Sequence, residues 1–288
     1  MAKITKVVGR QVFDSRGNPT VEAEVFLNNK VKASAIVPSG ASTGAFEAYE
    51  LRDNNKKYFL GKSVLTAVEN INTVINKNLK NINTEKQKKI DQILLDLDGT
   101  SNKKKLGANA LLAVSLAVAK AEAISKKKEL YQHLGKKLTL PIPLMNIING
   151  GAHADNNLRI QEFMIRPDSS KNFMDAIEKC FLVIQNLKKI LQSKNFLTNV
   201  GDEGGFAPSI NSNEEALNII VDSIEKSKLK PGIDINICLD VAANELINKE
   251  NMYSLNSSKF ISVDESINYY KNLVSKYPIK SIEDPFAE

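Results

Sequence analysis

The sequence predicts an α/β protein with an amino-terminal α+β domain followed by a β/α (TIM-like) barrel. Over residues 1–132, strand patterns come first and helical patterns follow, an order typical of α+β domains. From residue 138 to residue 288, short apolar strand patterns alternate with helical patterns, as in β/α units. Several of these later strand patterns carry carboxylates at or near their ends. Barrel enzymes place their active sites at the carboxyl ends of the strands.

The amino-terminal domain is expected to begin with strands and to continue with helices. Partial period-two alternation of apolar residues predicts three strands, over residues 4–12, 20–27 and 31–37. Helical spacing of apolar residues predicts three helices, over residues 64–79, 84–95 and 107–124. The last of these helices is apolar on nearly all sides, which indicates that it is buried.

The second domain is expected to follow the pattern of a barrel. Short apolar runs predict four strands, over residues 140–148, 160–165, 235–239 and 279–282. Apolar periodicity predicts helices over residues 173–192, 214–226 and 264–276. The Asn- and Lys-rich stretch 248–259 is expected to lie on the surface.

The composition is that of an ordinary globular protein. The chain has 288 residues, of which 42% are hydrophobic and 25% charged, and this argues against wholesale disorder. Every apolar run is shorter than the ~18–20 residues that span a bilayer, so we expect no transmembrane segment. Residues 1–10 lack the apolar stretch of a secretory signal. The two cysteines, Cys180 and Cys238, match no metal or redox spacing, which favours a reducing, cytoplasmic location.

The net positive charge of the chain comes mostly from scattered lysines. The net charge is +6, only five of the 39 basic residues are Arg, and Trp is absent. Nucleic-acid surfaces favour Arg forks and aromatic platforms, so we expect a solvated lysine surface and no nucleic-acid partner. Attraction of an anionic small molecule is the weaker functional interpretation.

Carboxylates stand on three of the four barrel strand patterns. Asp240 closes the third pattern, Glu283 and Asp284 close the fourth, and Gln161-Glu162 lies within the second. Two carboxylates on neighbouring strands can hold a hard cation such as Mg²⁺ through oxygen. A helix N-cap or a loop contact is the structural alternative for each Asp taken singly.

Three further residues have both a functional and a structural interpretation. Glu203 stands in a Gly-rich turn, where neighbouring carboxylates would raise its pKa toward that of a general acid, although a plain acidic turn has the same spacing. His153 follows the first barrel strand, and a lone His is more often structural than catalytic. Ser39 belongs to a small-residue loop that is either a mobile lid or an ordinary flexible loop.

Taken together, these segments resemble the enolase (phosphopyruvate hydratase) family over the whole chain. The matching motifs are 14–22 (DSRGNPTVE), 38–44 (PSGASTG), 106–110 (LGANA), 145–151 (MNIINGG), 161–164 (QEFM), 201–205 (GDEGG) and 281–284 (SIED). The resemblance implies a lyase of glycolysis that reversibly dehydrates 2-phosphoglycerate to phosphoenolpyruvate. It implies Mg²⁺ as the cofactor, which neutralises the dianion formed when a proton leaves carbon beside a carboxylate. It also implies an enolase-type barrel.

The resemblance assigns a role to each candidate residue. Asp240 and Glu283 would be ligands of the first metal, and Ser39 in the lid would help to bind the second metal and the substrate. Glu203 would protonate the leaving hydroxide, with Glu162 close by.

The resemblance also implies that Gln161 and His153 contact the substrate. It also implies a cytoplasmic homodimer, while family members are found at the cell surface and secreted as well.

An enolase barrel has eight strands, and about four are expected in residues 138–288. The other strands would carry the third carboxylate of the first metal site and the lysine base. We therefore expect this chain to be a carboxyl-terminally truncated enolase, a fragment that is inactive alone.

Two other functions remain as alternatives. The first is a non-catalytic binding or surface protein derived from an enolase. The second is an acid-sugar dehydratase or racemase of the wider superfamily, which would place a Lys-x-Lys pair at the second barrel strand, where this chain reads Gln161-Glu162.

Overall fold

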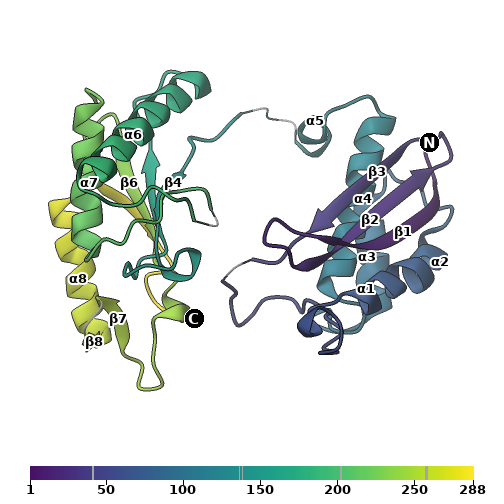
Figure 1. Ribbon diagram of the computed structural model, residues 1–288. Helices are drawn as coiled ribbons and strands as arrows, with labels where there is room; N and C mark the ends of the chain where they lie inside the picture. Colours follow the sequence, from purple (N-terminus) through teal and green to yellow (C-terminus); the bar gives the residue numbers. More distant parts are fainter. Residues whose placement is uncertain (41, 136, 138, 202, 257–258) are drawn as a thin grey trace. The chain divides into compact units, whose positions relative to one another are not determined.

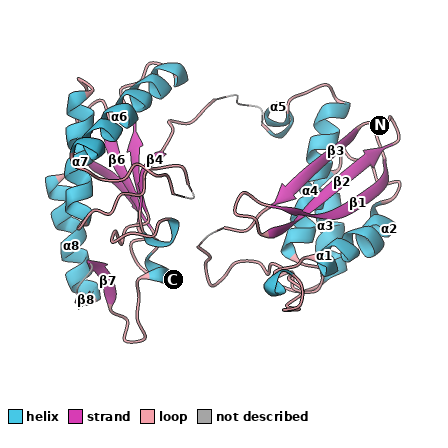
Figure 2. Cartoon of the chain, viewed as in Figure 1, coloured by secondary structure: helices cyan, strands magenta, loops and turns pink. Residues whose placement is uncertain are grey.

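The computed structural model describes residues 1–40, 42–135, 137, 139–201, 203–256 and 259–288. The chain divides into two compact units, Met1–Thr139 and Leu140–Glu288 (Figure 1). Each unit has its own hydrophobic core. Helices and strands are mixed in both units (Figure 2), and an α+β unit followed by a unit with a barrel-type sheet agrees with the predicted fold class.

The first unit begins with a three-stranded antiparallel sheet. Its strands are β1 (Ile4–Phe13), β2 (Pro19–Leu27) and β3 (Lys32–Val37), in the order β1-β2-β3. Along β2 the buried side chains alternate with partly exposed ones, as expected for a sheet with one face on the core. All three strands lie close to the predicted ranges.

Helices follow the sheet in the order that the periodicity predicts. They are η1 (Phe59–Gly61), α1 (Leu65–Asn70), the π-helical turn η2 (Ile71–Ile75), α2 (Asn76–Leu79), α3 (Gln87–Asp98), α4 (Ala108–Ser125) and α5 (Leu130–Leu134). The predicted helix over 64–79 exists as α1, η2 and α2. In this helix, Asn72 and Asn76 accept hydrogen bonds from the backbone of β1 at 2.9 and 2.8 Å. The two amides fix the helix to the strand.

Helix α4 is the central core helix of the first unit. Its buried side chains include Ala110, Val114, Ala117 and Val118, which pack with residues of β2 and β3 in one core. Among the described helices it alone is long and apolar enough to span a membrane, but 61% of it is buried inside the fold. We therefore interpret it as the buried helix that the sequence predicts.

The second unit contains a four-stranded sheet covered by helices. The strands are β4 (Met145–Asn149), β5 (Glu162–Arg166), β6 (Asn236–Asp240) and β9 (Ile279–Glu283), in the order β4-β5-β6-β9. The helices α6 (Phe173–Ser193), α7 (Asn213–Lys226) and α8 (Val263–Lys276) lie together on one side of this sheet (Figure 1). Short 3-10 turns, η3 (Gly151–His153) and η4 (Ala243–Glu245), follow β4 and β6.

Strand β5 runs in the direction opposite to its neighbours. It pairs antiparallel with both β4 and β6, whereas β6 and β9 are parallel. A parallel pair needs a crossover, usually a helix, and the segment between β4 and β5 contains only the short turn η3. The sequence pattern did not predict this reversal, and it matters for the site because the amino end of β5 lies beside the carboxyl ends of β4 and β6.

The stretch 248–259 is only partly a surface segment, contrary to the prediction. It carries β7 (Tyr253–Asn256), which pairs antiparallel with β8 (Lys259–Ile261). Tyr253 and Leu255 are buried at 4% and 1% exposure. The two side chains are two residues apart and so lie on the same face of the strand. This short apolar alternation indicates a strand, but the polar residues around it led to the prediction of a surface segment.

Candidate functional site

A row of carboxylates crosses one end of the sheet in the second unit. Glu162 is the first residue of β5 and lies opposite Asp240, the last residue of β6. Asp240 in turn lies opposite Glu283, the last residue of β9. Because β5 is antiparallel, all three carboxylates lie at the same end of the sheet. We call Glu162, Asp240 and Glu283 the carboxylate row.

The electrostatics of the carboxylate row favour uptake of positive charge. Burial, and after it the negative charges of Asp240, Glu203 and Glu283, raise the pKa of Glu162 from 4.5 to about 7. Burial also raises the pKa of Asp240, although a hydrogen bond from the Ala242 N–H opposes this effect. Glu162 and Asp240 therefore each favour a bound proton or a nearby cation over an uncompensated negative charge.

Gln161 touches the row directly. Its side-chain Nε2 donates to Asp240 Oδ2 at 3.2 Å, while the Ala242 N–H donates to Asp240 Oδ1 at 3.1 Å. Gln161 is buried, so the amide holds one oxygen of Asp240 in a fixed place.

His153 lies between two acidic side chains. Its Nδ1 is 3.4 Å from Glu162 Oε1, and its Nε2 is 3.9 Å from Glu203 Oε1. The ring is buried, at 7% exposure. The structure therefore brings together the two acids and the histidine that the sequence placed in separate segments.

Glu203 is carried by a tight loop that lies against β4. Within the loop, the Gly201 N–H donates to the Gly205 carbonyl at 2.8 Å, and the Gly204 N–H donates to the Gly201 carbonyl at 3.1 Å. The φ of Gly204 is +84°, a conformation that residues with side chains rarely adopt. Phe206 extends the contact, since its N–H donates to the Ile147 carbonyl at 2.9 Å.

Ser39 belongs to the first unit and is described within that unit alone. Its carbonyl accepts a hydrogen bond from Arg16 Nη2 at 2.5 Å. Together with Gly40, Glu47 and Asn109 it lines a pocket of about 240 Å³. The small-residue loop is therefore tied to the turn after β1, while Ala41 lies outside the described residues.

The described residues do not form a ready metal cage. No group of three or more His, Cys, Asp or Glu side chains among them is placed to hold a metal ion. The donor chemistry nevertheless fits Mg²⁺, because Asp240 and Glu283 are neighbours in register and supply the oxygen ligands that hard cations prefer. Burial is the main cause of the raised pKa of Asp240, and it disfavours a negative charge that no cation compensates. Two carboxylates would fill only part of the octahedral shell of Mg²⁺.

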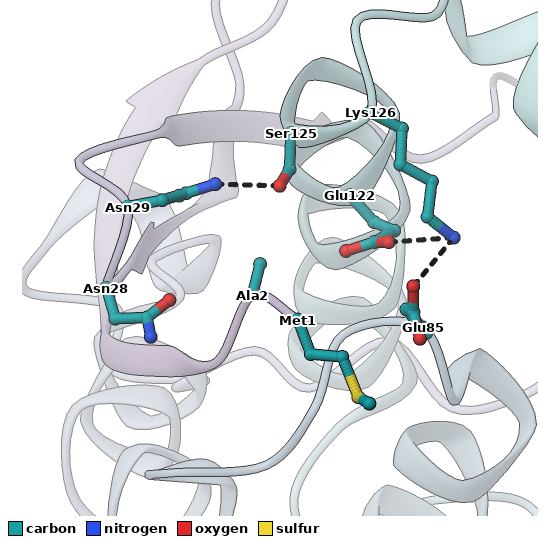
Figure 3. A pocket seen from close by; sticks show the side chains of 8 residues that line it. All are labelled: Met1, Ala2, Asn28, Asn29, Glu85, Glu122, Ser125 and Lys126. Atoms are coloured by element: carbon teal, nitrogen blue, oxygen red, sulfur yellow. Dashed lines mark hydrogen bonds and ion pairs between the residues drawn. The ribbon is translucent and has the colours of Figure 1, made fainter.

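The first unit has a second, larger pocket of about 390 Å³ (Figure 3). The Glu122 carboxylate is only 2% exposed and pairs with Lys126 Nζ at 3.0 Å, which also lies 3.3 Å from Glu85 Oε1. On the other wall, Asn29 donates to Ser125 Oγ at 2.7 Å. Because these groups satisfy one another, we interpret the pocket as part of the scaffold.

Replacing Thr84 by Val is expected to destabilise this scaffold. The Thr84 hydroxyl is buried and donates to the Glu122 carboxylate, so its loss leaves a buried carboxylate with one donor fewer. We expect the free energy of unfolding of the first unit to fall by about 1–2 kcal/mol, measured by urea unfolding. The matched Thr73→Val change on an exposed helix face should stay within about 0.5 kcal/mol of the parent. Equal effects of both changes would contradict this account.

An α+β unit followed by a barrel-type sheet, with carboxylates at one end of its strands, is the arrangement typical of β/α-barrel enzymes. Comparison with known proteins narrows this class. Residues 4–134 match the family model "Enolase, N-terminal domain", and residues 137–288 match "Enolase, C-terminal TIM barrel domain". The enolase of Pelagibacter ubique (strain HTCC1062) is 59% identical over 290 residues, which cover all of this chain and 69% of that protein. The chain belongs to the enolase family, whose enzymes are lyases (phosphopyruvate hydratases).

Proposed function

We propose that this chain carries the metal-ligand and acid side of an enolase active site. The reaction is the reversible, Mg²⁺-dependent dehydration of 2-phosphoglycerate to phosphoenolpyruvate. The observation that supports this proposal most is the carboxylate row, in which three carboxylates from adjacent strands lie in register at one sheet end. Family membership supplies the reaction, and homodimerisation and a cytoplasmic location remain predictions.

In this proposal Asp240 and Glu283 hold the first metal. Ser39, from the small-residue loop of the first unit, helps to hold a second metal once substrate is bound. Mg²⁺, when bound, supplies the positive charge that stabilises the dianion. Gln161 keeps Asp240 oriented through its 3.2 Å hydrogen bond and contacts the substrate, as does the neighbouring His153.

Glu203 is the proposed acid, which delivers a proton to the leaving hydroxide. Its loop leaves the side chain 51% exposed and facing His153, so the carboxyl group can reach a ligand. Glu162 lies on the other side of the same histidine. With its pKa raised to about 7, Glu162 can hold or release a proton near neutral pH.

A base for the carbon-bound proton must come from outside the carboxylate row. At this end of the four described strands stand Asn149, Glu162, Asp240 and Glu283, and none of them is a lysine. We propose that the base belongs to a part of the enzyme that corresponds to the uncovered 31% of the Pelagibacter enolase, because the match covers 69% of that protein. The 288-residue polypeptide alone is then a fragment without turnover.

The test compares two proteins. One is the 288-residue chain, and the other is a chimera in which this chain is joined to the part of the Pelagibacter enolase that the match leaves uncovered. We expect Mg²⁺-dependent formation of phosphoenolpyruvate by the chimera and none by the chain alone. Turnover by the chain alone would overturn the fragment proposal, and an inactive but folded chimera would overturn the assignment of the reaction.

Asp240→Asn in the chimera tests the metal assignment. Removing one ligand charge should raise the Mg²⁺ concentration for half-maximal activity by at least about tenfold. Asp222→Asn, on the exposed face of α7, is the matched control and should leave this concentration unchanged. An unchanged Mg²⁺ dependence in Asp240→Asn would exclude Asp240 as a ligand.

A further inference from the structure

Asn149, the last residue of β4, and Asn156, beyond the strand, bind the loop that carries Glu203, while Asn146 of β4 orients Asn149. Asn149 is fully buried, at 0% exposure. Its Nδ2 donates to the Gly205 carbonyl at 2.6 Å, and its Oδ1 accepts from Asn146 Nδ2 at 2.5 Å. The amide of Asn149 is thus oriented from behind by Asn146, and it presents its donor to the loop.

Asn156 ties the same loop from a second side. Its Nδ2 lies 2.9 Å from the Asn149 carbonyl and 3.1 Å from the Pro208 carbonyl, so it bridges the end of β4 and the end of the loop. The Asn156 Oδ1 accepts from the Leu158 N–H at 3.1 Å, which orients the amide. Asn146, Asn149 and Asn156 form what we call the asparagine clamp.

The loop fits against the clamp with no space for a side chain. A Cβ on Gly201 would lie 2.6 Å from Asn149 Nδ2 and 2.6 Å from the His153 carbonyl. A Cβ on Gly205 would lie 2.9 Å from the Ile147 carbonyl carbon. Real Cβ atoms do not approach heavy atoms so closely. The two glycines therefore permit direct contact between the loop backbone and the clamp.

This contact fixes the two points between which Glu203 is held. Gly201 and Gly205 flank Glu203 and are hydrogen-bonded to each other. The side chain of Glu203 is half-exposed and 3.9 Å from His153 Nε2, a distance too long for a hydrogen bond. Its place beside His153 is thus set mainly by the backbone of the loop.

We propose that Asn149 is a positioning residue that sets the place of Glu203 relative to His153 and the carboxylate row. The proposal rests on the proposed function for its catalytic meaning, but the positioning itself is a property of the folded chain. The competing interpretation is that Asn149 is a buried amide that only stabilises the second unit.

Asn149→Ala separates these interpretations when it is compared with Asn236→Ala. Asn236 is equally buried, at 2% exposure, and donates to Asp168 Oδ2 at 2.5 Å at the opposite end of the same sheet. A purely structural role predicts the same behaviour for both variants. Positioning predicts that only Asn149→Ala loosens the Glu203 loop.

The first measurement is made on the 288-residue chain and needs no activity. In Asn149→Ala we expect amide hydrogen exchange at Gly201 and Phe206 to accelerate at least about tenfold more than in Asn236→Ala. The chain has two histidines, so ¹⁵N-histidine spectra resolve each ring. The His153 resonances should move in Asn149→Ala while those of His133, in the first unit, stay in place.

The second measurement is kinetic and uses the chimera. Misplacing an acid costs turnover, so kcat in Asn149→Ala should fall by about 10- to 100-fold with little change in KM. Asn156→Ala, which cuts the second tie and keeps Asn149, is a milder variant for the case that Asn149→Ala fails to fold. It should change loop exchange and kcat in the same direction.

The outcomes separate the two proposals. Loop exchange and His153 resonances that match those of Asn236→Ala would overturn positioning by Asn149. A loosened loop with unchanged kcat would overturn its link to Glu203. An inactive parent chimera would instead refute the proposed function, while exchange and spectra would still decide the structural role of Asn149.

Discussion

Glu203→Gln is expected to lower kcat of the chimera by about 10²- to 10⁴-fold, the range that a general acid contributes. The amide keeps the size of the side chain and its place 3.9 Å from His153, but it has no proton to give to a leaving hydroxide. Because Glu203 is not one of the proposed metal ligands, the Mg²⁺ concentration for half-maximal activity should change little. Formation of phosphoenolpyruvate at saturating substrate measures the effect.

A matched control distinguishes loss of the acid from a general charge effect. Glu225→Gln removes one exposed carboxylate from α7 and should leave kcat unchanged. If Glu203→Gln also retains the parent kcat, Glu203 is not the acid, and Glu162, on the other side of His153, becomes the candidate to test.

The elements of the fold were largely predictable because each carries a local signal. Helix α6 shows apolar spacing that places Cys180, Val183 and Leu187 in the core, and the residues of β6 form an apolar run that ends in Asp240. The reversal of β5 was not predictable in this way. Strand direction depends on how the chain returns after β4, and the buried run Phe163–Ile165 of β5 is the same whichever way the strand runs.

The carboxylate row was predictable in composition but not in arrangement. Strand patterns that end in Asp240 and Glu283 indicate a metal-binding end of the sheet. Glu162 joins them only because β5 runs backwards and brings its first residue to that end. Asn146 and Asn149 belong to the matching motif 145–151, but nothing in that motif indicated the asparagine clamp, since an Asn next to Gly-Gly is typical of any turn. Its role depends on distances to backbone carbonyls, and only the folded chain shows those distances.

Because β5 runs antiparallel to its neighbours, Glu162 lies beside Asp240. The stability of the metal-free chain should therefore depend on pH through the protonation of Glu162. Its pKa is raised from 4.5 to about 7 in the folded chain, first by burial and then by the charges of Asp240, Glu203 and Glu283. The folded state therefore binds this proton more tightly than the unfolded state does. A stabilising contribution is fully present below pH 4.5 and is lost as the pH rises to about 7.

Glu162→Gln removes this dependence, because the amide stays neutral at every pH. After allowance for solvent screening, we expect the variant to be more stable than the parent by about 1–2 kcal/mol at pH 8, with little difference near pH 4. Urea unfolding of the metal-free chain at both values measures the free energies. Added Mg²⁺ should stabilise the parent at pH 8 more than the variant, because the cation offsets the charge that the variant lacks.

Glu265 provides a control of opposite sign in the same unit. In the capping box at the start of α8, the backbone N–H and the hydroxyl of Ser262 lower the pKa of Glu265. Its stabilising contribution is therefore present above the unfolded pKa and is lost as the pH falls through the folded pKa. Glu265→Gln should be less stable than the parent at pH 8 and should approach it in acid. If Glu162→Gln follows the same course as Glu265→Gln, the carboxylate row does not carry the charge excess on which the proposed metal site depends.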